Sequence, residues 1–153
     1  MKISTWNVNS VNARIEHLEK FIKKDQSDIY LLQELKTIEE GFPKEIIKNT
    51  GYYSYVNGQK AWNGVAILSK EKLEITNTSI PKYHDQNARF IETEIKLKKI
   101  KKNIKLINIY LPNGNPIETE KFDYKIEWMK KFNSYIQNLK NKNIPIIISG
   151  DFN

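Results

Sequence analysis

The stretch NIPIIISGDFN, residues 143–153, joins an apolar run to a polar tip. Its isoleucines predict a strand over residues 145–149 that is buried on both faces. Asp151 and Asn153 follow directly, so a carboxylate and an amide are expected where this strand ends. Because ligands in open α/β sheets bind beyond the strand ends, the stretch predicts a site at the edge of a sheet.

The rest of the chain alternates between strand and helix patterns. The predicted strands are residues 2–6, 29–33, 52–56, 64–69, 73–78, 89–97, 105–111 and 145–149. The predicted helices are residues 13–24, 43–49 and 118–141, the last with an apolar face of Phe122, Ile126, Met129, Phe132, Ile136 and Leu139. Hairpin-linked strands combined with covering helices indicate an α/β fold with mixed sheets.

Composition limits the class of protein. The 153 residues suit one domain, and the absence of cysteine excludes disulfides and thiolate metal sites. No stretch has the length of an apolar membrane span or a signal-peptide core, so a cytoplasmic location is expected. The net charge of +7 suits an anionic partner such as nucleic acid, although a genome rich in A and T would give the same excess of lysine.

The basic residues are almost all lysines. Only Arg14 and Arg89 are arginines, and a guanidinium grips phosphate through two hydrogen bonds where lysine offers a point charge. The lysine-rich residues 95–106 predict a hairpin with a solvated tip at Lys102 and Asn103.

Four predicted strands end in polar side chains. These are Asn7 and Asn9, Glu34 and Lys36, Tyr110 and Asn113, and Asp151 and Asn153. Each pair alone is more typical of a turn, a cap or a core tyrosine, but their recurrence indicates a site rich in oxygen ligands. Mg²⁺ takes such ligands, whereas the lack of cysteine and the presence of only two histidines argue against zinc.

Six motifs together resemble the ordered motifs of the exonuclease III family, the bacterial-type apurinic/apyrimidinic endonucleases of the endonuclease/exonuclease/phosphatase superfamily. They are STWNVNSVNAR (4–14), DIYLLQELK (28–36), GQKAWNGVAILS (58–69), ARFIETEI (88–95), NIYLPNG (108–114) and IIISGDFN (146–153). The motif at 58–69 and EKFDYKIEWM (120–129) favour this branch over deoxyribonuclease I or phosphoinositide phosphatases. The resemblance implies a four-layered, deoxyribonuclease I-like α/β sandwich. Residues 1–153 would be the N-terminal part of that single domain, cut within the GDFN motif.

The resemblance also implies roles at the metal and the reacting phosphate. Glu34 matches the principal Mg²⁺ ligand, and Asn7 matches an amide that helps to hold the metal, with Asn9 a weaker candidate beside it. Asp151 matches the carboxylate that orients or deprotonates the attacking water. Asn153 matches an amide that contacts the scissile phosphate, and both Asp151 and Asn153 are expected at the metal.

Further residues are expected to contact phosphate or DNA. Tyr110 matches a catalytic phenol beside the phosphate, while Arg89, Asn113 and Lys36 resemble residues that bind the DNA. Leu35 stands where the family usually has a threonine. A leucine cannot make the hydrogen bond by which that threonine would support the site, but the metal ligand Glu34 is unaffected.

The implied function is a nuclease of base excision repair that uses Mg²⁺, with Mn²⁺ as an alternative. It would act as an apurinic/apyrimidinic endonuclease and a 3′–5′ exodeoxyribonuclease on double-stranded DNA with abasic sites or 3′ ends, and would be a monomer when complete. The family carries an aspartate–histidine pair in its second half. His17 and His84 are predicted surface residues that cannot replace it, so residues 1–153 are expected to be inactive alone.

Two other functions stay open from the sequence. One is a superfamily relative that acts on RNA or on a small phosphodiester. The other is a non-catalytic remnant that binds nucleic acid weakly through its basic surface.

Overall fold

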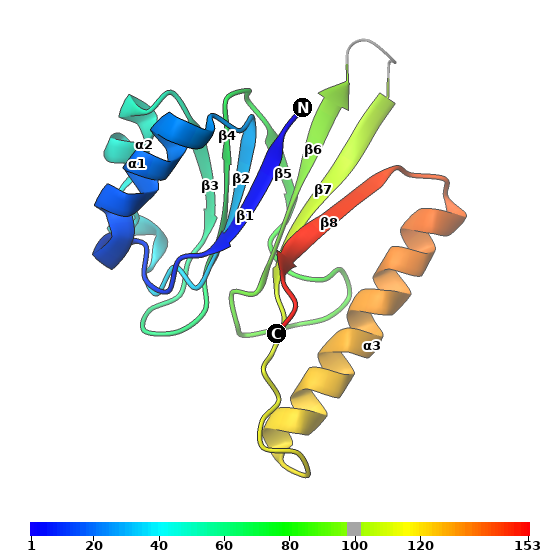
Figure 1. Cartoon of the computed structure of the whole chain (residues 1–153). Helices are drawn as coiled ribbons and strands as arrows, with labels where there is room; N and C mark the ends of the chain where they lie inside the picture. The colour runs from blue at the N-terminus through cyan, green and yellow to red at the C-terminus, as the bar shows by residue number, and fades with distance from the viewer. Residues whose placement is uncertain (98–101) are drawn as a thin grey trace.

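The computed structural model describes residues 1–97 and 102–153, which form four layers in the order helix, sheet, sheet, helix (Figure 1). The first sheet has the strand order β1-β2-β4-β3, with β1 (Ile3–Asn7), β2 (Ile29–Gln33), β3 (Tyr53–Asn57) and β4 (Val65–Ser69). The second has the order β5-β6-β7-β8, with β5 (Glu74–Asn77), β6 (Phe90–Leu97), β7 (Lys102–Tyr110) and β8 (Ile146–Asp151). The prediction of an α/β sandwich with mixed sheets is confirmed.

Each sheet contains one parallel pair of strands. β1 runs parallel to β2, and β8 runs parallel to β7, while the other neighbours are antiparallel. Carboxyl ends of parallel neighbours meet at the same edge of a sheet. This topology therefore brings the polar residues that follow β1 and β2 together, and likewise those that follow β7 and β8.

Helices cover the outer faces of the two sheets (Figure 1). A 3₁₀ turn (Asn12–Arg14) leads into α1 (Ile15–Asp25), and a second one (Glu39–Gly41) precedes α2 (Lys44–Asn49); both helices lie outside the first sheet. The long α3 (Glu120–Asn141) lies outside the second sheet. None of these helices is long and apolar enough to cross a membrane, among the residues that the structure describes.

Three apolar layers hold the sandwich together. One packs α1 and α2 against the first sheet around Leu18 and Ile47, and a second lies between the sheets around Leu31 and Ile67. The third packs α3 on the second sheet around Trp128, whose side chain has no exposed surface. Burial of this apolar surface is the main favourable contribution to folding.

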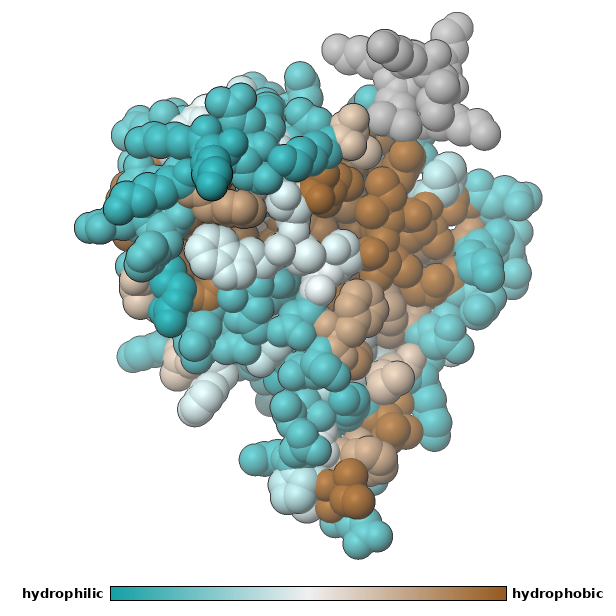
Figure 2. Space-filling view, in the orientation of Figure 1, coloured by the Kyte–Doolittle hydropathy of each residue, from teal (hydrophilic) through white to brown (hydrophobic). Residues whose placement is uncertain are grey.

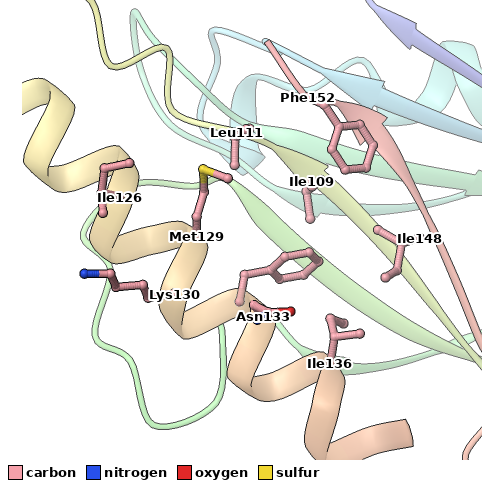
Figure 3. A pocket seen from close by; sticks show the side chains of 10 residues that line it. Ile109, Leu111, Ile126, Met129, Lys130, Asn133, Ile136, Ile148 and Phe152 are labelled. Carbon is pink, nitrogen blue, oxygen red and sulfur yellow. The ribbon is translucent and has the colours of Figure 1, made fainter. Parts of the chain in front are cut away.

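The face that α3 buries differs from the predicted one. Tyr124, Trp128 and Tyr135 pack against the sheet together with Phe132, Ile136 and Leu139. Met129 is instead 43% exposed and, with Ile126, borders an open apolar groove of about 570 Å³. Side chains of α3, β7 and β8 face one another across this groove, with Phe152 at its end (Figure 3). The helix has apolar and aromatic residues on two adjoining stripes, and spacing alone could not tell which one meets the sheet.

β8 is also less buried than predicted. All six of its residues are half-buried, because within the described residues β8 pairs only with β7 and the apolar groove lies open beside it. Apolar residues gather on the surface over β8 and the adjacent side of α3 (Figure 2). The predicted hairpin between β6 and β7 is present, but Lys102 and Asn103 lie inside β7, paired with Leu97 and Lys96. Residues 98–101 lie outside the described residues.

A buried carboxylate ties α3 to the second sheet. The Glu92 side chain has no exposed surface and accepts hydrogen bonds from the Lys105 ammonium at 3.0 Å and the Tyr135 hydroxyl at 2.5 Å. Thr76 and Asn77 of β5 donate to the same carboxylate. Burial acts to raise the pKa of Glu92, but the hydrogen bonds that it accepts outweigh burial and lower the pKa.

We expect Glu92→Gln to lower the free energy of unfolding by about 3 kcal/mol, because it leaves the largely buried Lys105 ammonium with only the more distant and more exposed Glu94 carboxylate. A carboxyl whose pKa is lowered by folding stabilises the protein above its ordinary pKa of 4.5 and loses that contribution as the pH falls through the folded value. Urea unfolding near pH 7 and near pH 4 should therefore show the variant's deficit shrinking at the lower pH.

The matched control is Glu94→Gln. Glu94 lies 3.9 Å from the same Lys105 ammonium, but its side chain is 24% exposed. A cost of less than about 1 kcal/mol is expected for this more exposed pair. Equal losses from the two variants would contradict the assignment of Glu92 as the buried anchor.

Candidate active site

Four chain segments meet at one edge of the sandwich. Asn7 is the last residue of β1, Glu34 follows β2 directly, and Tyr110 and Asp151 end β7 and β8 as register partners. The parallel pairing within each sheet brings two of these residues together. The close approach of β1 and β8 across the sandwich then joins the two pairs.

Asn7 connects the two carboxylates. Its Nδ2 donates to Glu34 Oε1 at 2.8 Å and to Asp151 Oδ2 at 2.6 Å. The Tyr110 hydroxyl also donates to Glu34 Oε1, at 2.8 Å. Residues that are 144 positions apart in the sequence thus form one hydrogen-bonded cluster, as the strand ends predicted.

The backbone around Glu34 is held in a left-handed conformation. Glu34 and Lys36 have φ angles of 53° and 54°, which non-glycine residues adopt only when the surroundings hold them there. The fully buried side chain of Leu35 supplies one such hold, and its backbone N–H donates to the Gly64 carbonyl. Leu35 therefore belongs to the apolar core that anchors the turn carrying Glu34.

Hydrogen bonds keep the Glu34 carboxylate ionised. Burial acts to raise its pKa, but hydrogen bonds from Asn7, Tyr110 and Lys36 outweigh burial and lower the pKa below its ordinary value. Burial, reinforced by the neighbouring Glu34 charge, raises the pKa of Tyr110 to about 12. At neutral pH the site therefore holds a charged carboxylate next to a neutral phenol that can donate a hydrogen bond.

Lys36 reaches into the same cluster. Its ammonium lies 3.3 Å from Glu34 Oε2 and donates to Asn9 Oδ1, and it also lies 5.7 Å from the ring centroid of Trp62. Asn9 lies beside Asn7, whose Oδ1 accepts the Asn9 backbone N–H at 3.0 Å. The site thus includes both asparagines that were predicted at the end of the first strand.

Asn153 and Asn113 form the rim next to Asp151. The Asn153 backbone N–H donates to Asp151 Oδ1 at 2.9 Å, and its side-chain amide donates to the Leu111 carbonyl. Asn113 Nδ2 lies 3.4 Å from Asn153 Oδ1, a long contact between two exposed amides. These amides are near the carboxylates and open to solvent.

Arg89 approaches from the other side of Tyr110. Its guanidinium carbon lies 4.8 Å from the Tyr110 ring centroid and 5.9 Å from that of Tyr124, and its Nη1 donates to the Tyr110 carbonyl at 3.2 Å. The eight main residues predicted for the site, and the weaker candidate Asn9, therefore lie on this edge of the sandwich. His17 and His84 are exposed, as predicted.

Sequence reasoning missed one wall of the site. A cleft of about 510 Å³ extends from Glu34 past Tyr110 and Arg89, and residues from the β3–β4 connection, the β5–β6 connection and α3 also line it. The polar and aromatic members that the sequence did not single out are Gln59, Trp62, Asn63, Asn87, Asn115, Lys121 and Tyr124. Three of them lie in the quoted motif at 58–69, but a motif match alone does not show which side chains point into a cleft.

The donor set fits a hard divalent cation. Glu34 and Asp151 offer carboxylate oxygens, and no group of three or more His, Cys, Asp or Glu side chains is placed to hold a metal ion in the described ranges 1–97 and 102–153. A cation here would take its remaining ligands from water and substrate, which is how Mg²⁺ is usually bound. A metal ion would bind an amide through its oxygen, but Asn7 turns its amide nitrogen toward both carboxylates. The role of Asn7 as a direct metal ligand therefore stays a prediction. The same holds for Asn153, whose amide nitrogen donates to the Leu111 carbonyl.

The two packed mixed sheets, their covering helices and the polar cluster at one edge define a deoxyribonuclease I-like α/β sandwich. The chain belongs to the Endonuclease/Exonuclease/phosphatase family, whose sequence model matches residues 4–153. It is 36% identical to exodeoxyribonuclease III of Haemophilus influenzae and 32% identical to an exodeoxyribonuclease of Bacillus subtilis, in each case over the whole chain.

Solved structures agree with this assignment. An AP endonuclease from Archaeoglobus fulgidus is 31% identical over 99% of the chain, with a TM-score of 0.88. A 3′ phosphatase from Neisseria, solved with a product DNA hairpin, is 30% identical over 100% of the chain, with a TM-score of 0.91. The chain covers 57% and 58% of these two structures, and 57% and 58% of the two curated relatives, so it spans little more than half of their length.

Proposed function

We propose that this chain carries part of the active site of a Mg²⁺-dependent DNA phosphodiester hydrolase of base excision repair, an apurinic/apyrimidinic endonuclease with 3′–5′ exonuclease activity. The observation that carries the proposal is the cluster in which Asn7 joins Glu34 to Asp151 beside Tyr110. Relatives named exodeoxyribonuclease III and AP endonuclease support it. Mn²⁺ is the alternative cation, and the active protein is proposed to be a cytoplasmic monomer.

The residues divide the chemistry between them. A bound Mg²⁺ would stabilise negative charge on the phosphate and on the leaving oxygen, with Glu34 as its main protein ligand. Asp151 accepts a proton from the attacking water or orients it. Tyr110 stays protonated because of its raised pKa, and its single hydroxyl proton, which is donated to Glu34 in the structure, would turn to a phosphate oxygen when the substrate binds. Asn153 and Arg89 hold further phosphate oxygens from either side.

The cleft suits a nucleic-acid backbone. Trp62 is 70% exposed next to the Lys36 ammonium and lines the cleft with Glu34, and exposed aromatic rings next to basic side chains are typical of nucleic-acid binding surfaces. Lys36, Arg89 and Lys121 add positive charge along the same cleft. A DNA strand is therefore a better fit than a small phosphodiester, which would leave Trp62 uncovered.

The relatives are longer than the chain, and we propose that residues 1–153 alone are inactive. The open groove beside β8 and the exposed Phe152 are surfaces that the additional length of the relatives would cover. Missing phosphate-stabilising groups typically cost ~10²–10³-fold each.

The test is complementation. The chain is co-expressed with the part of the Haemophilus influenzae relative to which it does not align. The assembly of the two polypeptides is the complemented protein. In Mg²⁺ it should cleave a DNA duplex carrying one abasic site, whereas the chain alone and the added part alone should not, and EDTA should stop cleavage. Cleavage in EDTA, or a well-folded complemented protein without nuclease activity, would contradict the proposal. Faster cleavage of RNA or of a small phosphodiester would instead favour a superfamily relative that acts on those substrates.

Arg89→Lys should weaken binding of abasic-site DNA by the complemented protein roughly tenfold, because a lysine cannot replace a two-bond grip on phosphate. The formal charge is unchanged, so the salt dependence of binding should stay the same. Gel-shift titrations at two salt concentrations measure both quantities.

The control for Arg89→Lys is Lys131→Gln, which removes a whole charge from the exposed side of α3. The sequence suggests a single lysine of the run at 98–102 as the comparison, but residues 98–101 lie outside the described residues. A binding loss at Lys131 as large as that at Arg89 would show that Arg89 acts only as one more positive charge.

A further inference from the structure

Asp85 joins the β5–β6 loop to α3. This loop, residues 78–89, contains neither helix nor strand and ends at the arginine of the site. The Asp85 carboxylate accepts the indole Nε1–H of Trp128 at 2.9 Å and the hydroxyl of Tyr124 at 2.9 and 3.0 Å. One carboxylate therefore anchors a loop without regular structure to two aromatic residues of the helix.

The same carboxylate shapes the end of the loop. Asp85 Oδ1 accepts the backbone N–H of Asn87 at 2.9 Å, and the Asn87 side chain donates to the Tyr124 hydroxyl at 3.1 Å. Gln59 and Asn63 of the β3–β4 connection donate to Asn87 Oδ1 at 3.4 and 3.2 Å. Two connections and one helix thus meet at residues 85–87, directly before Arg89.

Arg89 lies close to two tyrosine rings. Its guanidinium carbon is 4.8 Å from the ring centroid of Tyr110 and 5.9 Å from that of Tyr124. The backbone pairs with the same tyrosine, since the Tyr110 N–H donates to the Arg89 carbonyl at 2.9 Å. Tyr110 in turn donates to Glu34, so a continuous set of contacts links Asp85 to the carboxylate cluster.

We propose that Asp85 is a positioning residue for Arg89: by fixing Tyr124 and the end of the β5–β6 loop, it sets the guanidinium in place for a phosphate. The proposal rests on the proposed function for its role, but the geometry can be tested without catalysis. A guanidinium that is already held in its binding geometry loses less entropy when it grips a phosphate.

Asp85→Asn is the informative substitution, because no orientation of the new amide fits. Both carboxylate oxygens accept N–H groups, from Asn87 on one side and Trp128 on the other. An amide has only one oxygen, so its NH₂ group must face one of these donors. The matched control is Asp123→Asn, which makes the same charge change at an exposed position next to Tyr124 on the helix.

The first readout is hydrogen exchange of the arginine Nε–H groups in the chain itself, measured by NMR. The chain has only two arginines, so Arg14 serves as the internal reference. The Nε of Arg89 is buried and has no hydrogen-bond partner within the part of the chain that the structure describes. Its exchange with solvent therefore reports how tightly the tyrosine rings enclose it.

Asp85→Asn should speed exchange at Arg89 by about tenfold or more and leave Arg14 unchanged, whereas Asp123→Asn should change neither. If Asp85→Asn prevents folding, Tyr124→Phe takes its place, because it removes the bridging hydroxyl and keeps the ring beside Arg89. That variant should give a smaller increase at Arg89 alone. Unchanged exchange at Arg89 in a folded Asp85→Asn or Tyr124→Phe protein would overturn the proposal.

The second readout is a double-mutant cycle on the complemented protein. Asp85→Asn alone should lower kcat/KM for abasic-site DNA by about tenfold, but by less than about threefold when Arg89 is already lysine. Losses that multiply would mean that Asp85 does not act through Arg89. Absence of cleavage by the unsubstituted protein would instead count against the proposed function, and the exchange experiment would still decide the role of Asp85.

Discussion

Glu34→Ala in the complemented protein is expected to lower Mg²⁺-dependent cleavage of abasic-site DNA by at least ~10³-fold. Glu34 is the residue on which Asn7, Tyr110 and Lys36 all converge, and its lowered pKa keeps it ionised where a cation would bind. Its removal takes away the proposed metal ligand and the acceptor that orients the Tyr110 phenol. Single-turnover cleavage with excess protein measures the effect.

Two comparisons make the Glu34 result interpretable. Glu40→Ala removes an exposed carboxylate six residues further along and should leave the rate unchanged. Glu34→Gln keeps the size of the side chain and an oxygen acceptor, so it should lose activity with little change in thermal stability. Cleavage by either Glu34 variant at close to the unsubstituted rate would show that the metal assignment is wrong.

Asp151→Asn should separate turnover from binding. The amide keeps the size of the side chain but cannot accept a proton from water, so turnover should fall by about 10²–10⁴-fold. Its NH₂ group must face either the Asn7 amide or the Asn153 N–H, and the side chain of Asn7 is free to turn away from it. Affinity for abasic-site DNA, measured by fluorescence anisotropy in EDTA, should change less than about threefold. Parallel losses of binding and turnover would indicate that Asp151 serves only to hold Asn7 and the backbone of Asn153.

Asp123→Asn is the control for this second substitution as well. It carries out the same chemical change on the exposed side of α3 and should affect neither quantity. A fall in turnover with both variants would trace the effect to overall charge and not to the position of Asp151.

The strands could be predicted because their local residue patterns are typical of strands. The main site residues could be predicted because the sheet topology brings the ends of these strands together. β2 has the predicted bounds, since residues 29–32 form a continuous apolar run and all five residues of Ile29–Gln33 are buried. Polar residues directly after such strands converge once two of the strands run parallel. For this reason Glu34, Asn7, Tyr110 and Asp151 were found from the sequence alone.

Contacts made by isolated residues could not be predicted in the same way. Asp85 lies in a loop without periodicity, and its partners are 39 and 43 positions away on α3. Glu92 lies in a strand where an acid is most often solvated, and only the packing of Tyr135 and Lys105 over it reveals its burial. Such contacts depend on which face of α3 packs on the sheet. The sequence of α3 has two adjoining apolar stripes, so it does not predict that face.

Glu34 and Asp151 are proposed to form one metal-assisted site, and a Mn²⁺ titration of the ¹⁵N-labelled chain can show whether a cation binds there. Mn²⁺ broadens resonances near its binding site, and the backbone amides of Asn7, Glu34 and Asp151 should broaden before all others. Glu34→Ala should remove this early broadening. Earliest broadening around the exposed acids Glu39, Glu40 and Glu45, or broadening at Asn7 that survives Glu34→Ala, would contradict the account.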